Sequence, residues 1–362
     1  MIRWTRNILL LTAVGLLSGC NLVLLNPSGD VAAQQGDLII YATVMMCLVI
    51  VPVMALTVFF AWQYRASNKA ARYEPEWSHS ISLEIVVWAV PLAIIIVLAG
   101  LTWVATHRLD PYADLQRISS TQDIDPDVEP MQVNVVALDW KWLFIYPEHD
   151  IATVGEAAVV VNRPVEFKLT SDTVMNAFYV PEMAGMIYAM AGMETELNAV
   201  LNAPGTFKGI AANYNGAGFS NMDFDMKSFA TEADFDAWVE TVRSEAGGML
   251  SRESYNALAA PSQETGTIFY SGLEDGIYDR ILNMCTEEGE LCHDDMMMVD
   301  ALGGGGLDGL YNRMVFAGLC DADDPRALMA ILRPEIREDE DRLLAMLMPP
   351  TQSSPVLQSR SN

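Results

Sequence analysis

The sequence predicts a two-helix transmembrane hairpin, followed by an all-β domain and a mainly α C-terminal extension. Two uncharged apolar stretches, Leu38–Trp62 and Ile85–Thr106, predict the hairpin. Each is longer than the ~20 apolar residues that cross a ~30 Å hydrocarbon core. Short strand-like runs separated by Gly, Pro and Asn predict the β-domain over residues 131–230. Helix-like runs dominate the remainder of the chain.

The N-terminus has the pattern of a bacterial lipoprotein signal peptide over residues 1–19. Arg3 and Arg6 precede an apolar run, Ile8–Leu17, that is too short to span a bilayer. The run ends in Leu-Ser-Gly-Cys, which resembles the lipobox, in which the chain is cut before the cysteine and the thiol is acylated. An ordinary cysteine near a cleavage site is the alternative. We expect lipidation at Cys20, with the mature chain beginning outside the inner membrane.

The loop between the two stretches, residues 63–84, carries Arg65, Lys69 and Arg72. Basic residues in a short loop favour the cytoplasmic side. Segment 20–37 and residues 107–362 then lie in the periplasm, and the hairpin of residues 38–106 crosses the inner membrane twice. The lipobox and the charge rule predict this topology independently.

The net charge of -26 belongs entirely to residues 107–362, because residues 1–106 contain equal numbers of basic and acidic residues. An acidic soluble domain argues against nucleic acid as a partner. The charge favours either solubility or electrostatic steering of a basic protein. We prefer solubility, because the acidic residues are widely spread. Nucleic acid is therefore not an expected partner, whereas the two spanning stretches imply contact with membrane lipids.

The β-domain follows a polar linker, residues 107–130, that contains three prolines. Residues 131–138 and 140–147 begin the strands, and the second run is rich in aromatic residues, including Trp140, Trp142 and Tyr146. Roughly 100 residues of such short strands suit a cupredoxin-like Greek key. We expect these three aromatic residues in the core or at a subunit contact.

The C-terminal part divides into a helical segment, residues 231–270, and an acidic extension, residues 271–362. Helices are expected over 235–244, 251–260 and 326–348. The extension contains Cys285, Cys292 and Cys320. In an oxidising compartment we expect a disulfide between Cys285 and Cys292, or with Cys320. A soft-metal or redox-sensing role with His293 is the weaker alternative, because the spacing matches no strong metal pattern.

Residues 211–222 have the spacing of a copper loop without its ligands. They resemble the C-x-E-x-C-x-x-x-H-x-x-M loop of subunit II of haem–copper respiratory oxidases, which holds a binuclear copper centre. The matching positions, including the upstream histidine position, are Asn176, Ala211, Asn213, Asn215, Phe219 and Met222. Only Met222 keeps the ligand type of the family. Since such centres need thiolates and imidazoles, we expect no metal here.

Residues 175–181 and 186–193 resemble the quinol oxidase branch of this family, in which the copper ligands are absent. The resemblance covers residues 8 to about 270. It implies subunit II of a proton-pumping cytochrome bo-type ubiquinol oxidase, a structural and assembly subunit without a redox centre. It also implies haems and copper in subunit I, further subunits III and IV, and ubiquinol as the substrate of the complex. Glu84 matches a family glutamate at the mouth of a proton channel, although a plain helix N-terminal carboxylate is the alternative.

Two other functions are weighed against this one. A cytochrome c oxidase subunit II would relay electrons through copper, but residues 211–215 lack the cysteine pair that this requires. A free-standing copper-handling lipoprotein would use the Met and Cys clusters. A hairpin of two spanning helices exceeds what a simple anchor needs, which favours an intramembrane partner.

Overall fold

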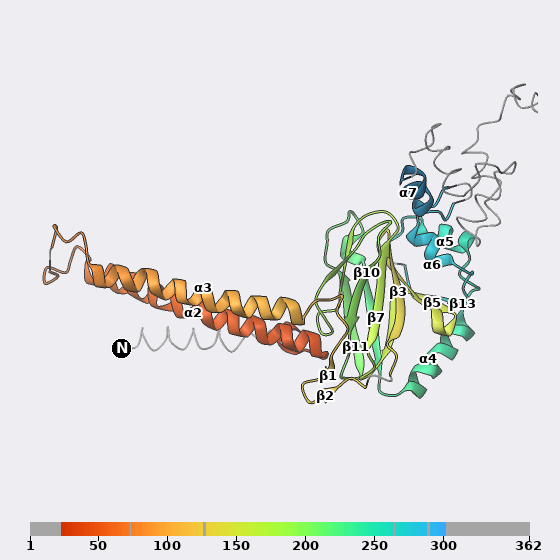
Figure 1. Cartoon of the computed structure of the whole chain (residues 1–362), viewed down its shortest axis with the longest axis horizontal. Helices are drawn as coiled ribbons and strands as arrows, with labels where there is room; N and C mark the ends of the chain where they lie inside the picture. The colour runs from red at the N-terminus through yellow and green to blue at the C-terminus, as the bar shows by residue number, and fades with distance from the viewer. Residues whose placement is uncertain (1–22, 73, 126–127, 264, 288–289, 302–362) are drawn as a thin grey trace, which may run out of the picture.

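The computed structural model describes residues 23–72, 74–125, 128–263, 265–287 and 290–301. The predictions for Cys20, Cys320 and the helix over 326–348 lie outside these residues. Two long helices, α2 (Asp30–Gln63) and α3 (Ile81–Arg108), run side by side and project from a β-domain (Figure 1). Both are long and apolar enough to cross a membrane.

The first turn of α2 belongs to the β-domain. The helix begins at Asp30, eight residues before Leu38, where the predicted uncharged stretch starts. Asp30, Val31 and Ala32 are buried. The backbone N–H of Gly29 donates to Glu182 O at 2.8 Å, and that of Ala32 donates to Met183 O at 3.3 Å. The hairpin and the β-domain are therefore joined by hydrogen-bonded backbone rather than by a loose linker.

The β-domain contains two sheets that pack face to face. The larger has the order β10–β7–β3–β4–β5–β13 and the smaller the order β6–β12–β11–β8–β9. Strands β3 and β7 pair in parallel, as do β6 and β12, and the other pairs are antiparallel. This two-sheet arrangement confirms the predicted cupredoxin-like class.

The bounds of the strands in the larger sheet are β3 (Met131–Leu138), β4 (Lys141–Tyr146), β5 (Ile151–Val154), β7 (Val165–Ser171), β10 (Thr195–Ala199) and β13 (Ile268–Ser271). Those in the smaller sheet are β6 (Glu156–Val160), β8 (Asn176–Tyr179), β9 (Ile187–Ala189), β11 (Gly205–Ala211) and β12 (Asp223–Phe229). A separate ribbon of β1 (Arg117–Ser119) and β2 (Gln122–Asp123) lies in the segment that leads from α3 to the sheets.

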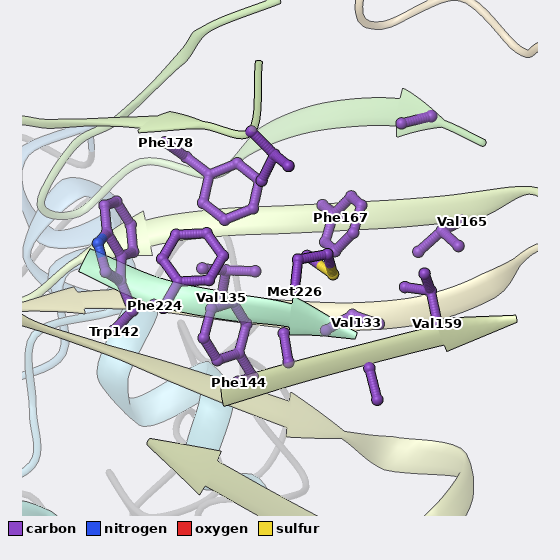
Figure 2. Packing of buried hydrophobic residues seen from close by; sticks show 14 of the residues in the cluster. Val133, Val135, Trp142, Phe144, Val159, Val165, Phe167, Phe178, Phe224 and Met226 are labelled. Atoms are coloured by element: carbon purple, nitrogen blue, oxygen red, sulfur yellow. The ribbon is translucent and has the colours of Figure 1, made fainter. Parts of the chain in front are cut away.

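Aromatic rings fill the space between the two sheets (Figure 2). The rings of Phe178 and Phe224 stack with centroids 5.2 Å apart, and Trp142 meets Phe178 edge-on at 5.5 Å. Such pairs add to the stabilisation that comes from burial alone. Trp142 and Tyr146 are fully buried, which confirms their predicted core position.

Helices cover the outer face of the larger sheet as well. Side chains from α5 (Arg252–Ala259) and α6 (Ile277–Leu282) form a second core with Leu143 and Ile145 of β4. On the inner face, helix α4 (Glu232–Glu245) packs Phe235 and Trp238 around Tyr146, as part of the core between the two sheets. Because both faces of β4 are covered, every residue of this strand is buried and the strand lacks the alternation of a half-exposed sheet.

The C-terminal part differs from the prediction at residues 268–271, which form strand β13 at the boundary between the segment expected to be helical, residues 231–270, and the acidic extension. Their backbone pairs antiparallel with β5, more than 100 residues earlier in the chain, so no local pattern marks the strand. Beyond it, Cys285 and Cys292 form a disulfide, which confirms the first of the predicted pairings. The bond joins the end of α6 to the start of α7 (His293–Ala301).

Candidate functional site

The loop of residues 211–222 connects β11 to β12 at one end of the smaller sheet. Ala211 pairs with Phe178 of β8, and Ala212 N donates to Ala177 O at 2.9 Å. This pairing brings the first residue of β8, Asn176, next to the loop. The fold thus collects the two separate stretches of the sequence that the copper-site spacing singled out.

Three of the expected positions share one hydrogen-bond network. The side-chain amide of Asn215 donates to the side-chain oxygen Oδ1 of Asn176 and, at 3.0 Å, to the sulfur of Met222. The amide of Asn176 donates in turn to Val174 O at 2.8 Å. Asn176 and Met222 are almost completely buried. The side chains of Asn176 and Asn215 are therefore bonded to each other where a metal would otherwise join them, and the buried Oδ1 of Asn215 has no hydrogen-bond partner among the described residues.

The other three positions lie in the same loop but outside this network. Ala211 is buried, and its N–H donates to Met222 O at 3.1 Å. The side chain of Asn213 donates to Met175 O at 3.1 Å. Phe219 packs edge-on against Tyr214, with ring centroids 5.5 Å apart. None of these three side chains bonds to the Asn176–Asn215–Met222 network in the residues that the structure describes.

The donor set of this loop does not fit a binuclear copper centre. It offers carboxamides and one thioether, whereas such a centre takes soft thiolates and imidazoles. The four histidines of the chain are His79, His107, His149 and His293, and none lies in the loop. Across the described ranges, no three His, Cys, Asp or Glu side chains are grouped as a metal site.

The indole ring of Trp140 packs against the loop of residues 211–222, a role that the strand pattern did not reveal. Its indole N–H donates to Asn215 O at 3.3 Å. A Cβ atom on Gly218 would lie 2.3 Å from the indole Cγ, so only glycine allows this close approach. The two glycines of the loop, Gly216 and Gly218, both lie against this ring. They were the sequence feature that could have indicated a close approach of a large side chain to the loop.

A second polar cluster lies behind the aromatic run and ties α5 to the larger sheet. The Tyr255 hydroxyl donates to Asp172 Oδ1 at 2.7 Å. The Lys141 ammonium donates to Ala260 O at 2.8 Å. Burial lowers the pKa of Lys141 and raises the pKa of Asp172, while the hydrogen bond from Tyr255 lowers the latter. Sequence reasoning missed this cluster because its members are spread along the chain.

We expect Asp172→Asn to change how stability depends on pH. The raised pKa means that the folded chain binds this proton more tightly than the unfolded chain does. Ionisation of Asp172 therefore lowers the free energy of unfolding as pH rises above the ordinary carboxyl pKa. The variant lacks this loss, so its stability relative to the parent should improve as pH rises from about 4.

Thermal unfolding of both chains across this pH range measures the difference. Asp275→Asn, at an exposed carboxylate in the same part of the domain, is the control and should keep a constant offset. A constant offset for Asp172→Asn as well would contradict the prediction.

Glu84 lies in the first turn of α3, at the end of the hairpin far from the β-domain (Figure 1). Its carboxylate is 2.6 Å from Nδ1 of His79, and both side chains are more than half exposed. The structure therefore separates this residue from the loop of residues 211–222 by the length of the helix. The two sequence-derived candidates are independent sites.

Parts of the chain are similar to known proteins. A family model described as the COX Aromatic Rich Motif matches residues 245–289, which includes α5, β13 and α6. This match extends past residue 270, where the resemblance of the sequence was expected to end. The periplasmic domain of subunit II of cytochrome oxidase from Bradyrhizobium japonicum aligns at 21% identity and a TM-score of 0.30, over 33% of this chain and 96% of that one.

Curated relatives cover most of the chain. Cytochrome bo(3) ubiquinol oxidase subunit 2 of Pseudomonas putida is 51% identical over 256 residues, which is 71% of this chain and 78% of the relative. Ubiquinol oxidase subunit 2 of Acetobacter aceti is 44% identical over 272 residues, 75% of this chain and 85% of the relative. At this level of identity and coverage, the chain belongs to the ubiquinol oxidase subunit 2 family.

Proposed function

We propose that the chain is the non-catalytic structural and assembly subunit of a proton-pumping oxidase that oxidises ubiquinol and reduces oxygen to water. In this proposal the haems and the copper lie in subunit I, and subunits III and IV complete the complex. The hairpin packs on subunit I, and the β-domain covers the periplasmic face. The curated relatives are ubiquinol oxidase subunits, which supports ubiquinol as the substrate.

The observation that carries the proposal is the composition of the copper-type loop. Asn215 donates to the side-chain oxygen of Asn176 and to the sulfur of Met222, so these positions form a network of carboxamides and one thioether that contains no thiolate or imidazole. Such a loop lacks the soft ligands that would hold copper, so it offers no metal centre to accept electrons from a soluble donor. A quinol reaches the complex from within the membrane, which makes a periplasmic relay dispensable.

The proposed location is the bacterial inner membrane, with a lipid anchor on Cys20 and the β-domain in the periplasm. The basic residues Arg65, Lys69 and Arg72 between α2 and α3 support a cytoplasmic loop. Both termini of the hairpin then lie on the periplasmic side, where α2 and α3 meet the β-domain (Figure 1).

The test is a mild-detergent pull-down through this chain, with metal analysis and oxygen uptake on ubiquinol and on reduced cytochrome c. We expect haem-bearing partners, uptake with ubiquinol, and no copper in the separated chain. Copper on the separated chain, or uptake driven only by cytochrome c, would overturn the proposal in favour of an electron-transfer subunit. Purification without any haem-bearing partner would favour a free-standing lipoprotein instead.

We predict that Cys20→Ala still assembles into the membrane complex. Two helices long enough to span a bilayer anchor the chain by themselves, whereas acyl chains add a weaker anchor. The measurement is the yield of haem-bearing complex in the membrane fraction, with the parent chain as the reference. Loss of the complex from the membrane would refute the prediction.

We also propose that Glu84 lies at the entrance of a proton route into the complex. Ionisable side chains near membrane depth often mark such routes, and His79 beside Glu84 is a second proton-carrying group. Glu84→Gln removes the titrating group but keeps the shape, so ubiquinol-driven oxygen uptake should fall several-fold. Glu76→Gln, in the exposed loop, is the control. Unchanged uptake in Glu84→Gln would leave this residue as an ordinary helix N-terminal carboxylate.

A further inference from the structure

A cavity of about 190 Å³, lined by both charged and apolar side chains, lies where the hairpin meets the β-domain. Its walls come from the first turns of α2, the end of α3, the segment that follows α3 and, from the β-domain, residues 185–186 and 197–198. It is smaller than the ~300–1,000 Å³ of pockets for drug-sized ligands, so it suits a small polar group rather than a whole cofactor. The charged side chains in its walls include Asp30, Arg108, Asp110, Asp114 and Arg117.

An apolar groove of about 250 Å³ continues from this cavity between α2 and α3. Leu38 and Tyr41 of α2 face Leu101 and Val104 of α3 across it. These residues belong to the uncharged stretches that fit the hydrocarbon core. Arg108 and Arg117 line both the groove and the cavity, so the two spaces form one site with a polar and an apolar part.

The charges at the polar end are not equivalent. Arg117 Nε is 2.8 Å from the buried carboxylate of Asp30, so its charge is already compensated. Arg108 ends α3, is exposed, and has no carboxylate within salt-bridge distance among the described residues. Asp110 and Asp114, in the segment after α3, also line the cavity. The site therefore presents an available cation beside two carboxylates.

We propose that this site binds one membrane phospholipid with an amine headgroup. Arg108 would bind the phosphate through charge-assisted hydrogen bonds, and the carboxylates of Asp110 and Asp114 would bind the ammonium group. One acyl chain would lie in the groove between α2 and α3. The proposal rests on the membrane placement of the hairpin and is independent of quinol oxidation.

The occupant is a free lipid rather than the acyl group on Cys20. Gln34, Asp37, Leu38 and Tyr41 recur at the spacing of one helix face and line the groove. Gly36 lies about 200° around the helix from Gln34. The backbone that precedes α2 packs against the helix at Gly36, where an added Cβ would lie 3.1 Å from Leu24 O. The chain that leads to Cys20 therefore approaches α2 on the face opposite the groove.

The test uses the purified complex in vesicles of phosphatidylethanolamine and phosphatidylglycerol that contain a phosphatidylethanolamine probe with a photoactivatable acyl chain. After illumination, label is mapped by peptide mass spectrometry and normalised to the amount of this chain. We expect label on the peptides that contain residues 34–41 and 101–109. Arg108→Gln should lower this labelling roughly tenfold, as expected for the loss of one charge-assisted hydrogen bond.

Two further variants make the result specific. Ala105→Phe fills the groove without changing any charge and should also remove the label. Arg72→Gln, at an exposed arginine in the cytoplasmic loop, is the matched control and should keep it. Absence of label from the groove, or labelling that both groove variants leave unchanged, would overturn the proposal. Labelling that rises in Cys20→Ala would also overturn it, because the chain's own acyl group would then be the occupant.

The result can be separated from the test of the proposed function. A chain that purifies without haem-bearing partners but is labelled in the groove would refute the oxidase role and retain the lipid site. A complex that oxidises ubiquinol but is not labelled would do the reverse.

Discussion

Phe224→Ala is expected to lower the free energy of unfolding of the β-domain by about 3–5 kcal/mol, the usual cost of such a truncation in a packed core. Phe224 is 1% exposed, and its ring stacks on Phe178 and lies 5.0 Å from Phe144. A Cβ on Gly209 would lie only 2.0 Å from this ring, so the ring rests directly on backbone. Since backbone surrounds part of the void, the neighbours cannot collapse to fill it.

Thermal or denaturant unfolding of the purified chain, followed by tryptophan fluorescence, measures this loss. Phe207→Ala on the neighbouring strand β11 is the control, because this phenylalanine is only partly buried. It should cost clearly less than Phe224→Ala. Equal losses would mean that the aromatic cluster between the sheets is not the main source of stability.

The membrane hairpin could be predicted from the sequence because its signal is local. Uncharged stretches and a basic loop need no knowledge of the rest of the chain. The starting point of α2 could not be predicted in this way. Asp30 is charged, yet it lies inside the helix because Arg117 and Gln34 bind its carboxylate at 2.8 Å. A partner 87 residues away decides that position.

The β-domain shows the same division between local and long-range information. Strand-like runs with turn residues between them located β7 and β11, whereas β13 exists only because it pairs with β5. The continuous burial of β4 reflects helices that arrive after residue 250. A short strand whose partner is distant in sequence has no periodic pattern of its own to detect.

The candidate site was located by spacing, but its chemistry needed coordinates. The motif spacing placed Asn176, Asn215 and Met222 together, and the structure joins them by hydrogen bonds. Neither the support from Trp140 nor the separation of Asn213 and Phe219 from the network follows from spacing. Side-chain direction depends on loop backbone geometry, which a motif does not specify.

Gly29→Ala is expected to weaken the attachment of the hairpin to the β-domain. An added Cβ would lie 2.4 Å from Val200 O and 2.6 Å from Met183 O. Both atoms are backbone, so neither can move aside as a flexible side chain would. Overpacking of this kind costs about 1–3 kcal/mol and occasionally more. The same backbone holds the hydrogen bond from Gly29 N to Glu182 O, which the displacement would also stretch.

The measurement is the yield of haem-bearing complex that co-purifies with the chain, together with protease cleavage between residues 26 and 33. We expect the yield to fall and cleavage to rise in Gly29→Ala. Gly100→Ala is the matched control, because a Cβ at this position in α3 would meet nothing within 4 Å. If both variants behave alike, the effect comes from glycine loss in general. If only Gly29→Ala fails, the tight junction at the start of α2 positions the β-domain over the membrane.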